Sequence, residues 1–148
     1  MNSVTKKHSS CLLKIAVLID VDGTLAGPYK HGYRKLHPTA LSAIKMLAKR
    51  THVFLWSIAG ADNGKRLIRE FPELKRYITG CYGKDEFPLD TVQQAYCIDD
   101  EAMDPQLFKC NYLIVDTYNG GADSGLLLEA AGTIVDHISR HFPCPSLS

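Results

Sequence analysis

The chain has 148 residues, of which 45% are hydrophobic and 22% are charged, and its formal net charge is +1. This length is enough for one domain with a sizeable core and too short for two. The near-neutral charge gives no indication of a nucleic-acid or anionic-membrane partner, and no apolar run approaches the length of a membrane span.

The first half of the chain alternates between strand-like and helix-like patterns. The apolar run at residues 14–20 predicts a buried strand. Residues 25–36 are rich in Gly, Pro, Tyr and basic groups and predict a loop or short flap. A helix, a strand and a second helix are then expected at residues 37–50, 52–57 and 62–71. Pro72 ends the second helix.

The second half predicts three more strands and two more helices. A weak strand at residues 77–82 is followed by a short helix at 88–95. Two further strands are expected at 95–98 and 112–115, and a final helix at 125–140. Strands that alternate with helices indicate a parallel sheet with right-handed crossovers.

The domain boundaries follow from this pattern. A single domain is expected at residues 14–141, between a flexible N-terminal segment at 1–13 and a C-terminal tail at 142–148. A cleaved signal peptide is rejected, because its removal would take away the first strand.

The chain contains five cysteines at wide spacings: Cys11, Cys81, Cys97, Cys110 and Cys144. The odd number and the absence of a CxxC pair argue against a disulfide framework or a zinc site. They favour a reducing compartment, and so a cytoplasmic location. Cys97 lies in a predicted strand and is expected to be a small core residue.

Polar side chains follow four of the predicted strands, at the edge where open α/β sheets bind their ligands. They are Asp20 and Asp22, Ser57, Lys84, and Asp99 with Asp100. Each has an ordinary structural explanation: serine and aspartate cap helices, and loop lysines are solvated. Two carboxylates held together at a strand end need a cation, and a hard ion such as Mg²⁺ suits them. The order and spacing of the set favour a functional site.

This set resembles the motifs of the haloacid dehalogenase (HAD) superfamily of phosphatases and phosphotransferases. Its first motif, an apolar strand followed by DxDGT, matches Ile19 to Thr24, and its second, a strand ending in Ser or Thr, matches Val53 to Ser57. Its third motif is a lysine, best matched by Lys84. Its fourth, an acidic DDxxxD pattern, matches Asp99 to Asp104. The resemblance covers residues 14–140.

The resemblance implies a role for each acidic residue. Asp20 would be the nucleophile that becomes an aspartyl phosphate, and Asp22 the general acid and base, with its backbone carbonyl on the metal. Mg²⁺ would also be held by Asp20 and Asp100, with Asp99 as a ligand or directly behind the ligands. For Asp104, a bond to a metal-bound water and a surface or helix-start role stay open.

Four further residues would bind the substrate phosphate: Ser57, Lys84, Gly23 and Thr24. Gly23 and Thr24 would also hold the turn, with Thr24 bonded to Asp22. Lys65 is a rival to Lys84, although it lies inside a predicted helix. Residues 58–64 would supply phosphate-binding amides or form a simple turn.

The resemblance implies a three-layer α/β sandwich with a Rossmann-like five-stranded parallel sheet in the order 5-4-1-2-3. Neither place where the family inserts a cap has room for one, so the chain resembles the capless branch. Asp22 favours phosphate chemistry over dehalogenation, and the lack of a cap argues against a mutase. The implied function is a Mg²⁺-dependent phosphomonoester hydrolase.

Substrates and partners follow less directly. The capless branch implies that the substrate is a phosphorylated small molecule or a phosphorylated macromolecule. A nucleic-acid end is possible as a substrate but is not indicated by the net charge. The flap carries basic and aromatic residues that could meet such a substrate or form a solvated loop: Tyr29, Lys30, His31, Tyr33, Arg34 and Lys35. Contact with a second copy of the chain, through the last helix or residues 119–124, stays open.

Two other classes of function remain as alternatives. A receiver-like signalling domain also groups acidic residues, a Ser or Thr and a Lys around Mg²⁺, but its phosphorylated aspartate lies on a middle strand and not in a DxDGT motif. A non-catalytic phosphate- and Mg²⁺-binding module is disfavoured, because every expected catalytic residue is present. A lasting aspartyl phosphate would support the receiver-like domain. Mg²⁺ binding without turnover would support the binding module.

Overall fold

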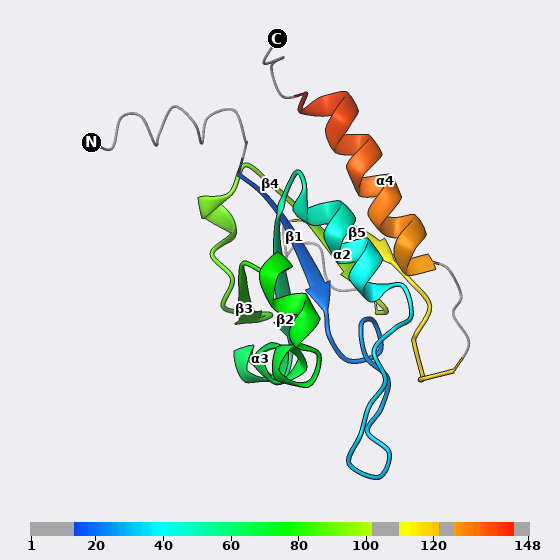
Figure 1. Cartoon of the computed structure of the whole chain (residues 1–148). Helices are drawn as coiled ribbons and strands as arrows, with labels where there is room; N and C mark the ends of the chain where they lie inside the picture. Colours follow the sequence, from blue (N-terminus) through cyan, green and yellow to red (C-terminus); the bar gives the residue numbers. More distant parts are fainter. Residues whose placement is uncertain (1–13, 102–109, 122–125, 144–148) are drawn as a thin grey trace.

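The structure is a computed structural model that describes residues 14–101, 110–121 and 126–143. The expected N-terminal segment, Asp104 and most of the expected C-terminal tail lie outside these residues. The described chain is built around one five-stranded sheet, whose strands all pair in parallel (Figure 1).

The order of the strands confirms the predicted topology. Across the sheet the order is β3-β2-β1-β4-β5, with β1 at the centre between β2 and β4. The five strands are β1 (Ile15–Asp20), β2 (His52–Ser57), β3 (Gly80–Gly83), β4 (Gln94–Asp99) and β5 (Asn111–Ile114). Because parallel strands end at the same edge, the polar residues that follow β1, β2 and β4 are neighbours in space.

One face of the sheet carries the larger part of the core. Ile15, Val17 and Ile19 of β1 belong there to one apolar cluster with residues of α2 (Ala40–Ala48), α3 (Ala61–Glu70) and α4 (Leu126–His141), and α3 contacts β2 and β3. A short 3-10 helix, η1 (Pro72–Tyr77), follows α3 and adds the buried Leu74. Every residue of β1 is buried, as expected for a central parallel strand that is covered on both faces.

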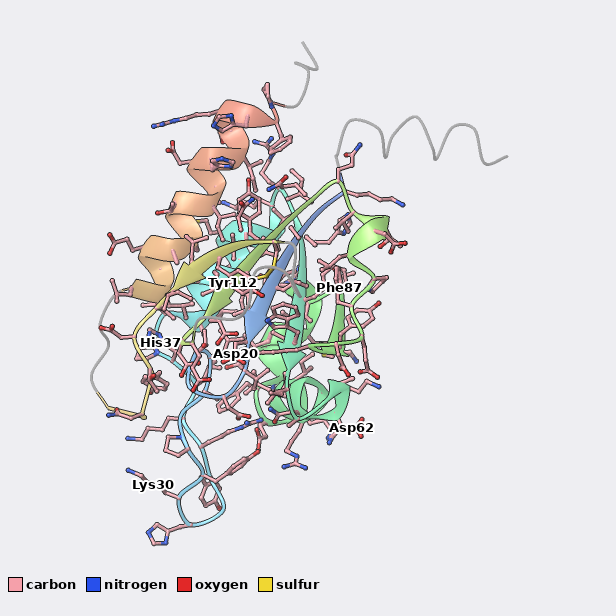
Figure 2. All side chains as sticks on the ribbon, turned by 180° about the vertical axis from the view of Figure 1, so that it is seen from behind. Asp20, Lys30, His37, Asp62, Phe87 and Tyr112 are labelled. Carbon is pink, nitrogen blue, oxygen red and sulfur yellow. A yellow bond between two sulfur atoms is a disulfide. The ribbon has the colours of Figure 1, made fainter. Side chains whose placement is uncertain are left out.

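The opposite face has a smaller apolar cluster that includes Ala16, Leu18, Trp56 and Phe87. Figure 2 views the molecule from this side, with Phe87 and Tyr112 labelled. The Phe87 ring meets the rings of Phe54 and Tyr82 at centroid distances of 4.9 and 5.1 Å. In the described chain, the segment that follows β3 therefore covers this face.

The predicted helix at residues 88–95 is wrong. Only a three-residue 3-10 helix, η2 (Leu89–Thr91), forms there, and β4 begins at Gln94. Gln94 and Ala95 pair with β1, so pairing within the sheet overrides the local pattern. The other predicted elements are present with boundaries shifted by a few residues.

The expectation for the cysteines also needs correction. Cys97 is buried as predicted, but it is joined by a disulfide to Cys110, just before β5, with a Cα–Cα distance of 6.3 Å. The odd number and wide spacing of the cysteines therefore did not exclude a disulfide, and the argument for a reducing compartment loses its support. Cys81 is free and partly buried.

Loss of this disulfide is expected to lower the free energy of unfolding by up to about 3 kcal/mol, because the bond closes a loop between residues 13 positions apart. Cys110→Ala is the suitable variant, since Cys110 is partly exposed and Cys97 is fully buried. Urea unfolding with and without reductant measures the difference, which should vanish under reduction. Equal stability of the two proteins without reductant would contradict the prediction.

The two connections that could hold a cap domain contain none. Between Thr24 and Ser57 the chain forms the flap (residues 25–36), α2 and β2, and between Ser57 and Lys84 it forms α3, η1 and β3. The flap is a hairpin that projects beyond the sheet edge (Figure 1), with bridges between Ala26 and Leu36 and between Lys30 and Tyr33. None of the helices in the described ranges is long and apolar enough to cross a bilayer.

Candidate active site

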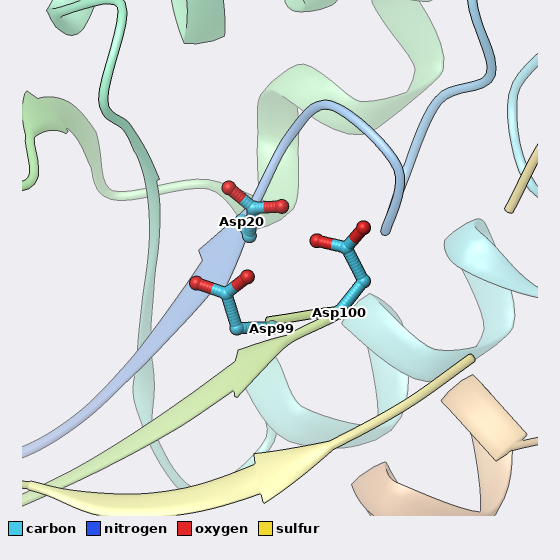
Figure 3. A group of neighbouring side chains, drawn as sticks. All are labelled: Asp20, Asp99 and Asp100. Carbon is cyan, nitrogen blue, oxygen red and sulfur yellow. The ribbon is translucent and has the colours of Figure 1, made fainter. Parts of the chain in front are cut away.

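Three carboxylates converge at the carboxyl ends of β1 and β4. Asp20 is the last residue of β1, Asp99 is the last of β4, and Asp100 follows it. One oxygen of each lies within 4.8 Å of the other two, and Figure 3 shows the three side chains around a common space. Three carboxylate oxygens at this spacing suit a hard divalent cation. The side chain of Asp22 lies outside this group.

Asp20 is buried and is held by two neighbours. Its Oδ1 lies 3.1 Å from Nζ of Lys84, and its Oδ2 accepts a hydrogen bond of 3.0 Å from the hydroxyl of Thr24. Burial and the charge of Asp99 raise the pKa of Asp20 to about 8, although Lys84 and Thr24 act in the opposite direction. A bound cation would favour the ionised carboxylate.

Lys84 bridges the two buried aspartates. Its Nζ lies 2.6 Å from Oδ2 of Asp99 in addition to its contact with Asp20, and its side chain is only 10% exposed. Burial alone would lower the pKa of Lys84, but the hydrogen bonds and charges of the two aspartates outweigh it and raise this pKa. The structure therefore places Lys84 inside the site, whereas Lys65 is exposed on α3.

Asp99 and Asp100 differ in their surroundings. Asp99 is almost fully buried, and its oxygens accept from Lys84 and from the backbone N–H of Glu101. Burial raises the pKa of Asp99, and Lys84 and Glu101 oppose this effect. Asp100 is partly exposed and accepts a hydrogen bond from Thr117 at 3.0 Å. Asp99 is therefore engaged by Lys84 and by the N–H of Glu101, whereas Asp100 is the more accessible of the two carboxylates. Which of the two would bind a metal directly stays a prediction.

Gly23 and Thr24 shape the turn after β1. Gly23 has φ +82°, and a Cβ atom there would collide with Oδ2 of Asp100, so this position strongly favours glycine. Its N–H donates to the carbonyl of Ala26. The predicted bond from Thr24 to Asp22 is wrong, because Thr24 donates to Asp20. A direct contact of Gly23 or Thr24 with phosphate stays a prediction.

Ser57 and Asp22 complete the predicted set on the other side of Asp20. Ser57 is buried at the end of β2, and its Oγ accepts from the N–H of Ala59. Residues 58–60 form a turn, and α3 begins at Ala61. The side chain of Asp22 is 61% exposed, and its Oδ1 lies 3.2 Å from Nη1 of Arg34.

Two residues whose side chains contact Asp22 were missed in the sequence. They are Arg34 and Asn63. Arg34 was noted only as a flap residue, yet its side chain is fully buried, and its Nε lies 2.6 Å from Oε1 of Glu70 on α3. The same carboxylate accepts a hydrogen bond from Tyr29, whose ring lies 4.7 Å from the Arg34 guanidinium carbon. The flap is thereby fixed to α3. Asn63 belongs to residues 58–64, and the Gly, Asp and Asn content of that segment is the one signal that could have found it.

These side chains surround one open cleft of about 310 Å³. It is lined by Asp20, Asp22, Ser57, Ile58, Lys84, Asp99, Asp100 and Glu101. Ile58 at its edge is 86% exposed, which is unusual for a large apolar side chain. All six polar residues predicted at the strand ends therefore line the same cleft.

Comparison with known proteins supports the fold. The chain matches no protein-family profile and no curated protein sequence. Among solved structures it resembles the RNA polymerase II CTD phosphatase Fcp1 of fission yeast, in a variant bound to beryllium fluoride, with a TM-score of 0.54 and 12% identity. The match covers 93% of this chain and 55% of that one. At this identity the likeness concerns the fold alone, and it shows that the chain has a haloacid dehalogenase-like α/β fold.

Proposed function

We propose that the chain is a Mg²⁺-dependent phosphomonoester hydrolase that works through an aspartyl phosphate on Asp20. The observation that carries the proposal is the position of Asp20, which lies between Lys84 and Thr24 and faces Asp99 and Asp100 in an open cleft. A buried carboxylate with an adjacent cation and a metal-type donor set is the arrangement that phosphoryl transfer to an aspartate requires.

The donor set fits the expected metal. Asp20, Asp99 and Asp100 supply only carboxylate oxygens, the ligand type that Mg²⁺ prefers, and the backbone carbonyl of Asp22 is a further candidate ligand. When bound, the ion would offset the negative charge that otherwise keeps an anionic phosphate from an anionic nucleophile.

The reaction proceeds in two displacements. An oxygen of Asp20 attacks phosphorus while the bond from phosphorus to the leaving oxygen breaks, and Asp22 gives its proton to that oxygen. A water molecule then attacks the phosphoryl group, and Asp22 takes a proton from this water. The bond between phosphorus and Asp20 breaks, phosphate leaves, and both aspartates return to their initial states.

Ser57 and Lys84 bind the phosphoryl group during both displacements. Lys84 carries a positive charge beside Asp20, where the charge of the phosphoryl oxygens would lie. The hydroxyl of Ser57 donates a hydrogen bond to one of these oxygens from the end of β2.

The cleft has no cap, so its substrate is either a phosphorylated small molecule or a phosphorylated macromolecule. Fcp1 is named as a phosphatase of the RNA polymerase II CTD, in a structure bound to beryllium fluoride. The exposed Ile58 and the flap side chains at the same sheet edge are available to contact the body of such a substrate.

Hydrolysis of p-nitrophenyl phosphate by the wild-type protein, with Mg²⁺ and with EDTA, tests the proposal. Release of nitrophenol that requires Mg²⁺ and that beryllium fluoride inhibits is the expected result. A phosphorylated protein that persists without turnover would replace the proposal with a receiver-like function. Binding of Mg²⁺ without any turnover would replace it with a binding module.

A further inference from the structure

We propose that Asn63 is a positioning residue that orients Asp22 and Ser57 together. Its Nδ2 lies 2.8 Å from Oδ2 of Asp22 and 2.9 Å from Oγ of Ser57, so one amide group joins the proposed acid–base residue to the proposed phosphate donor. This inference deepens the proposed function and rests on it for the roles of the two partners.

The start of α3 brings Asn63 to this place. Gly60 has φ +103° and turns the chain back, so that its N–H donates to the carbonyl of Ser57. The N–H of Asn63 in turn donates to the carbonyl of Gly60, which places Asn63 in the first turn of the helix, directly above the end of β2. Figure 1 shows α3 beside the carboxyl end of β2.

The amide must present its nitrogen to both partners. When Asp22 is ionised, its carboxylate oxygens only accept hydrogen bonds, so the amide oxygen of Asn63 would be repelled from them. An amide nitrogen has two hydrogens, one for each partner. Asparagine therefore matches this position, whereas aspartate would set two carboxylates against each other.

The hydroxyl hydrogen of Ser57 is directed by these contacts. The Oγ of Ser57 already accepts one hydrogen from the N–H of Ala59 and one from Asn63. A hydroxyl has two acceptor sites and one hydrogen, so both acceptor sites are filled and the hydrogen is left to donate. Asn63 thereby prepares Ser57 as a donor to a phosphoryl oxygen.

Asp22 gains a fixed orientation from the same amide. Its side chain is 61% exposed, and without partners it would exchange between rotamers. Arg34 holds Oδ1 from the flap side, and Asn63 holds Oδ2 from the α3 side. Arg34 is itself fixed by Glu70, so the carboxylate of Asp22 is held between two anchored groups.

The test compares two substrates with wild type and Asn63→Ala. p-Nitrophenolate leaves without a proton, whereas the alkoxide of glycerol 2-phosphate needs one from the general acid. The variant is expected to lower kcat/KM about tenfold for p-nitrophenyl phosphate, through Ser57, and about 100-fold for glycerol 2-phosphate, through Ser57 and Asp22. In an Asp22→Asn background the extra loss for glycerol 2-phosphate should disappear.

Asp62→Ala, at the exposed neighbouring position of α3, is the matched control. It should leave kcat/KM unchanged for both p-nitrophenyl phosphate and glycerol 2-phosphate. Equal losses for the two substrates in Asn63→Ala would overturn the link to Asp22. Thermal unfolding of each variant separates these effects from loss of the fold, which alanine in a helix should preserve.

A titration with inorganic phosphate in the presence of Mg²⁺ tests the link to Ser57 without turnover. Asn63→Ala is expected to raise the Kd for phosphate about tenfold. An unchanged Kd would overturn this link. If the wild type hydrolyses neither substrate, the proposed function fails, and the phosphate titration still decides whether Asn63 orients Ser57.

Discussion

Replacement of Asp20 by asparagine is expected to lower kcat/KM for p-nitrophenyl phosphate by about 10⁴-fold or more. The amide cannot attack phosphorus, yet it has nearly the same shape and can still accept the hydrogen bond from Thr24. Steady-state kinetics at saturating Mg²⁺ measures the loss. Turnover near the wild-type level in the variant would exclude Asp20 as the nucleophile.

The same substitution has a distinct effect on stability in the metal-free protein. Because burial raises the pKa of Asp20 from 3.8 to about 8, the folded chain keeps a proton between these values that the unfolded chain has released. The unfolding free energy of the wild type therefore falls as the pH rises from about 4 to about 8. The asparagine side chain does not titrate in this range, so we expect a smaller decline in Asp20→Asn.

Thermal unfolding in EDTA across this pH range measures the effect. Above pH 8 the metal-free variant should unfold at a higher temperature than the wild type, and Mg²⁺ should stabilise the wild type more than the variant. The variant would then have lower activity but higher stability than the wild type, and this combination distinguishes a catalytic carboxylate from a structural one. The same pH dependence in both proteins would show that Asp20 does not carry the proton.

Replacement of Lys84 by methionine is expected to lower kcat/KM by about 10³-fold. Methionine keeps an unbranched apolar side chain in the cleft and removes the ammonium that lies 3.1 Å from Asp20 and 2.6 Å from Asp99. Without that charge, the two buried aspartates repel each other, and the phosphoryl group loses a cation. The Mg²⁺ concentration needed for the half-maximal rate measures the effect of the repulsion between the aspartates. The value of kcat measures the effect of the missing cation on the phosphoryl group.

Lys65→Met is the matched control, because Lys65 is an exposed lysine on α3. It should keep wild-type activity within about twofold, since exposed charges contribute little to a site they do not touch. A large loss in Lys65→Met together with a small one in Lys84→Met would reverse the assignment and make Lys65 the catalytic lysine.

The strands and the sheet edge that carries the site could be predicted from local patterns, whereas the strand order came from the family resemblance. The apolar run before Asp20 indicates a strand that is buried on both faces, and the glycine at position 23 indicates where it ends. In a parallel sheet each strand delivers its polar residue to the same edge, and the strand order that the resemblance implied determines which of these residues meet.

The remaining features depend on contacts between distant residues. The segment at 88–95 has a helical pattern, but β1 imposes an extended start on β4. Cys97 and Cys110 are brought together by the pairing of β4 with β5. Arg34 contacts Glu70 across 36 positions of sequence, and Asn63 contacts Asp22 across 41. No local pattern encodes such pairs.

The flap combines a fixed base with a free tip. Arg34 at its base is buried and clamped to Glu70, whereas Tyr33, the preceding residue, is 80% exposed, and Lys30 and His31 are also exposed at the turn. Changes at the tip can therefore accumulate, through evolution or through loop exchange in the laboratory, without displacing Asp22. The hairpin therefore joins an anchored base, which holds Asp22, to a tip whose residues can be exchanged independently of that anchor.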